Sequence, residues 1–573
     1  MAGKTFRDRP WLEHYVEGVP EEIKFEDTLL TDFLERWAKQ RPNEDALIFQ
    51  GYKMSFKDLE NSVNRLATRL SGFGIKKGDR VAILLPNVIP CVISYYATHK
   101  IGAIVVMNNP LYSDRELENQ FNNSGARVLI TLDLLGNRMI DLRKKTGIRQ
   151  IIYTSIGDYL PFPKNYLFRL VAKKKKLAAV VKPADDVYKW KDILSETPPN
   201  PPAVELDLDD VAMYQYTGGT TGVSKGAILT HRNISYNTQQ FTAWFPGMKG
   251  NKQICLAAPP YFHAFGLTAA MNASILMGWT QIVIPKPQPT ELLEAIRKFK
   301  PSIVYLVPTM FLGILNHPDF DQVDMKCIKL CGSGGGALPV DVLLKIEEKT
   351  GCPFSEGYGM TEASPITHIN PFGGLRKPGS VGVPISNTLA RVVDLNDGET
   401  EVPVGEIGEI VFKGPQIMKG YLGLPDETAK ALKGGWLHSG DIGKMDEDGY
   451  FYVVDRKKDM VISGGYNVYP LEIEKIYLEH PKVADVAAIG VPHPTRGEQV
   501  KLIIVPKEGS TVTEEEIIEY CGDKLAKYKW PTMVEFRSEI PKSAIGKILK
   551  HVLREQHVVS EIKRDRQEAE RSN

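Results

Sequence analysis

The sequence predicts an α/β protein with a large N-terminal domain and a small C-terminal domain. Its 573 residues are too many for one hydrophobic core, so two or more domains are expected. Short apolar runs alternate with helical periods over residues 43–135, and the same rhythm returns over 252–336. This alternation is typical of mostly parallel sheets, and its repetition indicates two α/β subdomains.

Each element follows from apolar periodicity and from the turn residues that bound it. An amphipathic helix is predicted over 55–72, with Ser55 as its N-cap. Further helices are predicted over 264–277, 289–299, 308–317 and 470–480, and one begins near residue 230. The predicted strands are 46–50, 80–85, 104–107, 127–131, 211–216, 254–258, 280–284, 303–307, 328–331, 486–491 and 501–506.

The texture changes near residue 380. Short strands at 408–413, 443–445 and 450–455 are separated by Gly, Pro and Asp turns, which predicts a β-rich subdomain whose expected form is a β-barrel. The charged pentapeptide 455–459 marks a domain boundary that leaves a C-terminal domain of about 110 residues. The charge-dense residues 561–573 are expected to form a frayed tail.

Composition excludes several classes of protein. The net charge of +1 gives no global field for nucleic acid. The 6 cysteines form no C-x-x-C pair, so a structural zinc site is not expected, and buried thiols in a reducing compartment are the better interpretation. The charged N-terminus has no apolar signal core, and the longest apolar stretch, 81–107, is broken by two prolines. A cytoplasmic location is expected.

The run Tyr216–Gly226, Y-T-G-G-T-T-G-V-S-K-G, is the strongest local signal. Its unhindered backbone N–H groups, hydroxyls and lysine suit a polyphosphate, although it does not fit the P-loop pattern G-x-x-x-x-G-K-S/T. A flexible surface turn is the alternative interpretation. A predicted strand before the loop and a predicted helix after it favour the phosphate site.

Other motifs are unspecific when taken singly. His263 lies among aromatic residues at a helix start, where a core or capping histidine is the commoner case. Tyr358 stands between glycines in G-Y-G-M-T-E, which suits a purine face and a hard cation, or a plain tight turn. Further weak motifs are S-G-D at 439–441 and K-S-A-I-G-K at 542–547. The run 332–337 also matches a relaxed dinucleotide pattern, so an NAD-dependent oxidoreductase is a rival, although Pro339 fits it poorly.

The segment 157–181 combines aromatic residues with four consecutive lysines. Two interpretations stay open: a solvated loop, or a segment resting on an anionic membrane surface. In the second case the residues that face lipid would be Phe162, Tyr166, Leu167, Phe168 and Leu170.

Taken together and in order, these motifs resemble the adenylate-forming superfamily, which includes acyl-CoA synthetases, firefly luciferase and nonribosomal-peptide adenylation domains. The resemblance covers about residues 27–554, and Gly218 together with Leu160-P-F-P-K is similar to bacterial long-chain fatty acid–CoA ligases. It implies a ligase of fatty acid and lipid metabolism that uses ATP, Mg²⁺ and coenzyme A. A carboxylate attacks the α-phosphate of ATP to give acyl-AMP and pyrophosphate, and the coenzyme A thiol then takes the acyl group while AMP leaves.

The resemblance also implies a domain scheme with alternating conformations. Residues 1–455 would form the adenylation domain, 456–458 a hinge, 459–560 a mobile domain and 561–573 the tail. Lys458 would be the hinge residue, and Gly464, Gly465 and Tyr466 would line the coenzyme A tunnel. The expected partners are the fatty acid, ATP and coenzyme A, without nucleic acid. A homodimer and a peripheral contact of the 157–181 segment with the cytoplasmic membrane face stay open.

The site residues are carried over by motif. Lys547, Glu362, Thr217 and Lys225 would be catalytic, with Glu362 as the metal ligand and Lys547 acting in the first half-reaction only. His263, Leu267 and Gly334 would line the acyl pocket, where Leu267 replaces a gating tryptophan of one long-chain relative. The implied nucleotide-binding residues are Thr217, Gly218, Gly219, Thr220, Thr221, Gly222, Lys225, Gly334, Gly335, Gly336, Ala337, Tyr358, Gly359, Thr361, Asp441 and Arg456.

Two other functions stay open at this point. One is an adenylating enzyme for a short-chain or aromatic acid, or one that loads a carrier-protein thiol. The other is a non-catalytic nucleotide-binding relative, against which the joint presence of Lys225, Glu362 and Lys547 argues.

Overall fold

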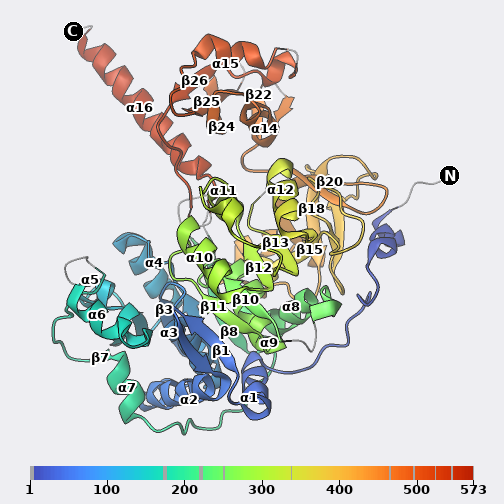
Figure 1. Cartoon of the computed structure of the whole chain (residues 1–573). Coiled ribbons are helices and arrows are strands. Elements are labelled where there is room, and N and C mark those ends of the chain that lie inside the picture. Colours follow the sequence, from blue (N-terminus) through green and yellow to red (C-terminus); the bar gives the residue numbers. More distant parts are fainter. Residues whose placement is uncertain are drawn as a thin grey trace. The chain divides into compact units, whose positions relative to one another are not determined.

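The structure is a computed structural model, and its chain divides into two compact units (Figure 1). The large unit comprises Trp11–Leu389 and Phe412–Leu437, and the small unit comprises Met1–Pro10, Ala390–Val411 and His438–Asn573. The described residues are 5–171, 177–217, 224–248, 252–336, 338–463, 466–493, 497–522, 524–543 and 546–571.

The first sheet of the large unit has nine strands in the order β16-β15-β14-β13-β12-β10-β11-β1-β2. Its centre is parallel, and antiparallel pairs lie at both ends. The strands are β1 (Asp45–Phe49), β2 (Tyr52–Ser55), β10 (Ile254–Ala257), β11 (Thr280–Val283), β12 (Ile303–Leu306), β13 (Leu330–Ser333), β14 (Phe354–Gly359), β15 (Ile366–Ile369) and β16 (Val383–Pro384).

The second sheet has eight strands in the order β19-β9-β8-β4-β3-β5-β6-β7. It is parallel from β8 to β7, while β9 and β19 are antiparallel additions at one edge. Its strands are β3 (Arg80–Leu84), β4 (Ile104–Met107), β5 (Val128–Leu132), β6 (Gln150–Thr154), β7 (Val187–Lys189), β8 (Val211–Thr217), β9 (Lys225–Thr230) and β19 (Gly420–Tyr421). Two mostly parallel sheets confirm the predicted pair of α/β subdomains.

Two helices fill the space between these sheets. Helix α2 (Phe56–Gly72) packs on β1 and β2, helix α3 (Ile89–Lys100) packs on β3 and β4, and the two helices pack on each other. Nearly every residue of α3 is buried, as expected for a helix covered on all sides. The predicted cap of α2 is confirmed, because the Ser55 hydroxyl accepts a hydrogen bond from the Asp58 N–H.

The large unit contains several further helices. They are α1 (Leu30–Gln40), α4 (Asp114–Ser124), α5 (Asp133–Arg143), α6 (Lys164–Val171), α7 (Trp190–Glu196), α8 (His231–Ala243), α9 (Ala273–Met277), α10 (Pro289–Phe299), α11 (Pro308–Leu315), α12 (Val340–Thr350) and α13 (Pro425–Ala431). The helix predicted over 264–277 is confirmed, but its residues Gly266–Asn272 are π-helical, followed by α9. Short π-helical turns are rare and occur often at functional sites.

The β-rich region is an open sheet of four strands in the order β17-β18-β20-β21. These strands are β17 (Leu389–Val393), β18 (Gly408–Lys413), β20 (Leu437–Met445) and β21 (Phe451–Arg456). The predicted β-barrel is wrong, since within the described ranges the edge strands β17 and β21 do not pair. The reason is that the neighbouring short strands β16 and β19 join β15 and β9 of the two large sheets instead.

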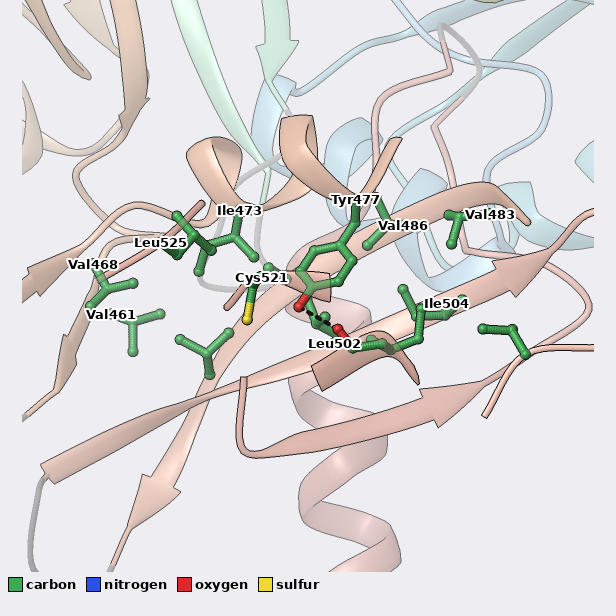
Figure 2. Packing of buried hydrophobic residues seen from close by; sticks show 14 residues of the cluster. Val461, Val468, Ile473, Tyr477, Val483, Val486, Leu502, Ile504, Cys521 and Leu525 are labelled. Carbon is green, nitrogen blue, oxygen red and sulfur yellow. Dashed lines mark hydrogen bonds between the residues drawn. The ribbon is translucent and has the colours of Figure 1, made fainter. Parts of the chain in front are cut away.

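The C-terminal part of the small unit is one sheet with helices on both faces. Figure 2 shows the core under α14, where Tyr477 donates a hydrogen bond of 2.9 Å to the Ile517 carbonyl. Ala487, Ile489 and Leu553 belong to a separate cluster that joins the opposite face to α16. The elements are β22 (Val461–Ser463), β23 (Tyr466–Val468), β24 (Val483–His493), β25 (Gly497–Pro506), β26 (Met533–Phe536), α14 (Pro470–Leu478), α15 (Glu514–Tyr520) and α16 (Lys550–Arg571).

The structure also tests the predictions made for the C-terminal tail and for the cysteines. The prediction that residues 561–573 fray is wrong as far as Arg571, because α16 continues to that residue. The Glu, Lys, Arg and Gln residues of this segment are strong helix formers. All six cysteines are free, and five are buried, as predicted. No helix among the described residues is both long enough and apolar enough to cross a membrane.

Candidate active site

The predicted phosphate loop joins two antiparallel strands of the second sheet. Thr217 ends β8, Lys225 begins β9, and the two residues are cross-strand partners. The Thr217 hydroxyl donates a hydrogen bond of 3.4 Å to the Lys225 carbonyl. A strand, β9, therefore follows the loop before the predicted helix α8 begins at His231. The loop residues Gly218, Gly219, Thr220, Thr221 and Gly222 lie outside the described residues.

Lys225 and Glu362 are linked through the edge strand β19. Glu362 is buried in the turn Thr361–Ala363, and its Oε1 accepts a hydrogen bond of 2.7 Å from the Tyr421 hydroxyl. The Lys225 Nζ lies 5.2 Å from the centre of the Tyr421 ring. It also lies 2.5 Å from the Glu427 Oε2 of α13. A cation and a buried carboxylate thus share one aromatic neighbour.

The predicted adenine-binding strip lies at the ends of β13 and β14. The Tyr358 ring packs 5.9 Å from Phe412 and 5.7 Å from His368, centre to centre. Gly359 admits no other residue, because a Cβ there would lie 1.8 Å from the Pro365 carbonyl oxygen. Gly335 and Gly336 are exposed, whereas Ala337 lies outside the described residues.

The predicted acyl-pocket residues gather on the π-helical turn. His263 precedes it and its carbonyl accepts the Leu267 N–H, while the Leu267 side chain is buried. The Phe265 ring lies against Gly334, where a Cβ would meet it at 3.0 Å. Thr268 donates a hydrogen bond of 2.9 Å to the Ser364 carbonyl, two residues from Glu362. The turn therefore lies beside the glycine strip and the candidate metal ligand.

In the small unit, Asp441 and Arg456 face each other across β20 and β21. Asp441 is buried, and its Oδ1 lies 3.0 Å from the Arg456 Nε. A buried carboxylate keeps its charge only when such partners compensate for the lost water.

Glu409, at the start of β18, holds the loop that carries Asp441. Its buried carboxylate accepts hydrogen bonds from the Gly440 N–H and from Lys457 Nζ, both 3.1 Å long, and His438 Nδ1 lies at 3.4 Å. Burial alone would raise the pKa of Glu409, but the bonds to His438 and Lys457 outweigh it and lower the pKa to about 2. Glu409 therefore stays ionised and joins the Asp441 loop to the residue before Lys458.

Two lysines with depressed pKa values lie near this pair. The surrounding protein atoms, and then the Arg456 charge, lower the pKa of Lys547 to about 7, while Asp441 opposes the shift. Desolvation and Arg456 likewise lower the pKa of Lys458. Both side chains also contact solvent, so water screens part of each effect. Lys547 lies shortly before α16, and its backbone N–H donates a hydrogen bond of 3.1 Å to the Ser543 hydroxyl.

Of the residues predicted for the coenzyme A tunnel, only Tyr466 is described, and it begins β23. Tyr466 is exposed there, and Gly464 and Gly465 lie outside the described residues. Sequence reasoning missed Tyr421, Glu427 and Glu409. The only signal was for Glu409, a single acidic residue inside the otherwise apolar strand G-E-I-V-F.

Comparison with known proteins gives a match over nearly the whole chain. The AMP-binding enzyme family matches residues 34–422, and the C-terminal domain of AMP-binding enzymes matches residues 472–547. The long-chain-fatty-acid–CoA ligase of Bacillus subtilis (strain 168) is 44% identical over 555 residues, which is 96% of this chain and 98% of the relative.

Solved structures of similar fold hold nucleotides. An anthranilate CoA ligase in complex with anthranoyl-AMP superposes with a TM-score of 0.81 at 27% identity, covering 93% of this chain and 98% of that one. ATP-bound MatB from Rhodopseudomonas palustris superposes with a TM-score of 0.79 at 29% identity, covering 92% and 99%.

Proposed function

Because the chain belongs to the AMP-binding enzyme family, we propose that it is a long-chain fatty acid–CoA ligase. It activates a fatty acid with ATP to acyl-AMP, releasing pyrophosphate, and transfers the acyl group to coenzyme A, releasing AMP. The observation that carries this function is the 44% identity to the Bacillus subtilis ligase over 96% of the chain. Two relatives named for aromatic acids are less similar, a feruloyl-CoA synthase at 35% identity and the anthranilate CoA ligase at 27%, so an aromatic substrate is less favoured.

The large unit supplies the groups for the triphosphate. Thr217 and Lys225 stand at the two ends of the glycine- and threonine-rich loop, where a hydroxyl and a cation suit phosphate oxygens. Glu362 fits Mg²⁺, a hard cation that prefers oxygen ligands and keeps several waters when one carboxylate holds it with substrate phosphates. Its Oε1 accepts a bond from Tyr421, and Oε2 accepts none from the described residues. When bound there, Mg²⁺ would neutralise phosphate charge.

The small unit supplies the groups for the ribose and the reacting carboxylate. Asp441 accepts the ribose hydroxyls, and Arg456, already fixed on Asp441, adds donors on the same side. Lys547 binds the fatty acid carboxylate and the α-phosphate oxygen in the first half-reaction, since a cation there relieves the repulsion between two anions. In the large unit, Tyr358 and the strip Gly334–Gly336 would contact the adenine.

The second half-reaction requires Lys547 to leave. Lys458 would act as the hinge. A turn there supports this role, because the backbone N–H groups of Asp459 and Met460 both bond to the Arg456 carbonyl. A few dihedral changes in such a turn move everything that follows. Residues 459–560 would rotate, and the segment with Gly464, Gly465 and Tyr466 would then line the thiol tunnel.

The acyl chain enters beside the π-helical turn. His263 and Gly334 would flank the reacting carboxyl, and buried Leu267 would line the pocket. A leucine leaves more room than the tryptophan that gates one relative.

Pyrophosphate release across acids from acetate to palmitate, with benzoate included, tests the proposal. We expect release with long-chain acids in the absence of coenzyme A, and acyl-CoA only when the thiol is added. A maximum at acetate or benzoate would overturn the long-chain assignment.

Peripheral membrane contact through α6 is a second proposal. Phe162, Tyr166 and Leu167 expose 85%, 62% and 54% of their surfaces, and Lys164 lies among them. Exposed aromatic residues beside cations suit an anionic lipid surface. The Leu170 side chain and the residues Lys173–Lys176 lie outside the described part of the chain.

Sedimentation with vesicles of phosphatidylcholine and phosphatidylserine tests the contact. Leu167→Ser should weaken binding, whereas Leu344→Ser, which removes an equally exposed leucine on α12, should not. Equal binding by both variants would contradict the proposal. The homodimer implied by the resemblance is tested by sedimentation equilibrium.

A further inference from the structure

The segment Gly420–Ala431 contacts both sides of the candidate phosphate site. Its strand β19 pairs with β9, setting Tyr421 opposite Ala227, two residues from Lys225. The Leu422 N–H bonds the Gly226 carbonyl, and the Met418 N–H bonds the Glu362 carbonyl at 2.9 Å. The backbone around Tyr421 is therefore fixed to both the lysine strand and the carboxylate turn.

The Tyr421 side chain contacts Glu362 and Lys225 through different chemical groups. Its hydroxyl donates to the Glu362 Oε1 at 2.7 Å, and its ring face lies 5.2 Å from the Lys225 Nζ. A carboxylate only accepts hydrogen bonds, so the tyrosine hydroxyl is the donor in this pair. The face of an aromatic ring attracts a cation independently of the hydroxyl.

Glu362 depends on this bond because it is buried. A buried carboxylate with a single donor has few other restraints on its rotamer, and the described residues offer Oε1 only Tyr421. Orienting Oε1 in this way leaves Oε2 as the oxygen for a cation.

We propose that Tyr421 is a positioning residue that orients Glu362 through its hydroxyl and Lys225 through its ring. This inference rests on the proposed function, since it assigns Glu362 to the metal and Lys225 to the phosphates. It predicts that the two interactions separate in different variants. Tyr421→Phe removes the hydroxyl and keeps the ring, whereas Tyr421→Leu removes both.

The test is calorimetric binding of ATP to the full chain, with and without Mg²⁺, and without fatty acid so that no adenylate forms. Tyr421→Phe should lower ATP affinity about tenfold with Mg²⁺, the effect of one hydrogen bond to a charged group, and leave metal-free affinity unchanged. Tyr421→Leu should weaken binding in both conditions. Mn²⁺ titration followed by electron paramagnetic resonance should show the same loss of the ternary complex in Tyr421→Phe.

The matched control is Tyr188→Phe, which removes a tyrosine hydroxyl that donates to Asp186 at 3.2 Å on β7, the opposite edge of the same sheet. It should leave both affinities unchanged. Equal losses with and without Mg²⁺ in Tyr421→Phe would mean general damage and would overturn the proposal, as would wild-type binding.

The variant Glu362→Gln tests the metal assignment of Glu362 separately from the positioning role of Tyr421. It should abolish the effect of Mg²⁺ on ATP affinity, and the double variant with Tyr421→Phe should be no worse. If Glu362→Gln keeps the Mg²⁺ effect, the metal assignment itself fails. If it loses the effect while Tyr421→Phe behaves as wild type, only the positioning role fails.

Discussion

Arg456 and Asp441 are direct partners across β21 and β20, with the Arg456 Nε 3.0 Å from the Asp441 Oδ1. Asp441 is buried, and this guanidinium fixes the direction of its carboxylate. A ribose that binds Asp441 meets an oriented carboxylate rather than a mobile one, which lowers the entropy lost on binding.

Asp441→Asn should weaken ATP binding by about ten- to a hundredfold, because the amide keeps the shape but loses the charge that strengthens each hydrogen bond. Calorimetry gives the affinity. Asp446→Asn serves as control, since Asp446 caps the turn of the same β20–β21 hairpin by accepting from the Asp448 and Tyr450 N–H groups. It should lower thermal stability and leave ATP affinity intact. A parallel loss in both variants would assign Asp441 to the fold alone.

Lys547→Ala should abolish pyrophosphate release and spare thioester formation from supplied acyl-AMP. The two half-reactions can be assayed separately, by pyrophosphate release and by acyl-CoA formation. Equal losses in both would rule out a lysine that serves only the first step.

The depressed pKa of Lys547 predicts a pH limb for the first half-reaction. Its pKa is lowered from 10.5 to about 7, so the ammonium loses its proton as pH rises through this value, and kcat/KM for ATP should fall above about pH 7. Lys547→Arg keeps its charge throughout and should remove the limb. A limb that persists in this variant belongs to another group.

Lys458→Pro should slow the thioester step more than the adenylation step. Proline fixes φ and so restricts the rotation that a hinge requires, while the Lys458 N–H donates no described backbone hydrogen bond that would be lost. Single-turnover transfer from acyl-AMP to coenzyme A measures the second step. Lys458→Ala keeps the backbone free and should show a much smaller loss. Unchanged transfer in the proline variant would remove the hinge assignment.

Local signals in the sequence predicted many of the helices and strands, but not which strands pair with one another. Ser55 capped its helix as expected, because the N-cap and the apolar period both act within one turn. The prediction of a β-barrel was wrong because β16 and β19 pair with strands of the two large sheets. Periodicity alone does not reveal such pairing. Periodicity located many of the longer strands, but it missed short ones such as β16 and β19 and showed no strand pairing.

The candidate site divides in the same way. Lys225 and Glu362 were found from motifs, yet the Lys225–Glu427 pair spans 202 positions and leaves no local pattern. Glu409 was missed for the same reason, since its partners His438, Gly440 and Lys457 are assembled by sheet pairing. A buried charge is identified by its partners, and these come from the tertiary structure.

Glu409→Gln should destabilise the small unit by about 1.5–3 kcal/mol, the range for hydrogen bonds to a charged group. It should also reduce ATP affinity, because the Gly440 N–H and Lys457 lose the carboxylate that fixes the Asp441 loop. The wild-type pKa of about 2 lies below the ordinary 4.5, so this stability is present above pH 4.5 and disappears as pH falls towards 2. Denaturant unfolding near pH 4.5 and near pH 2 measures this loss in the free energy of unfolding. A variant with the same acid dependence as wild type would show that Glu409 is not its source.

Glu427→Gln should tighten the binding of ATP and pyrophosphate. The Glu427 carboxylate lies 2.5 Å from the Lys225 ammonium, so an incoming phosphate competes with it for one cation and is repelled by its charge. The amide keeps the size of the side chain and removes that competition. Glu427 also contacts Lys430 at 3.1 Å, so Lys430→Gln is a suitable control that changes the neighbouring charge without touching Lys225. Calorimetric titration of pyrophosphate gives the affinity, and stronger product inhibition should accompany tighter binding. Weaker binding in Glu427→Gln would instead show that the carboxylate holds Lys225 in its binding position.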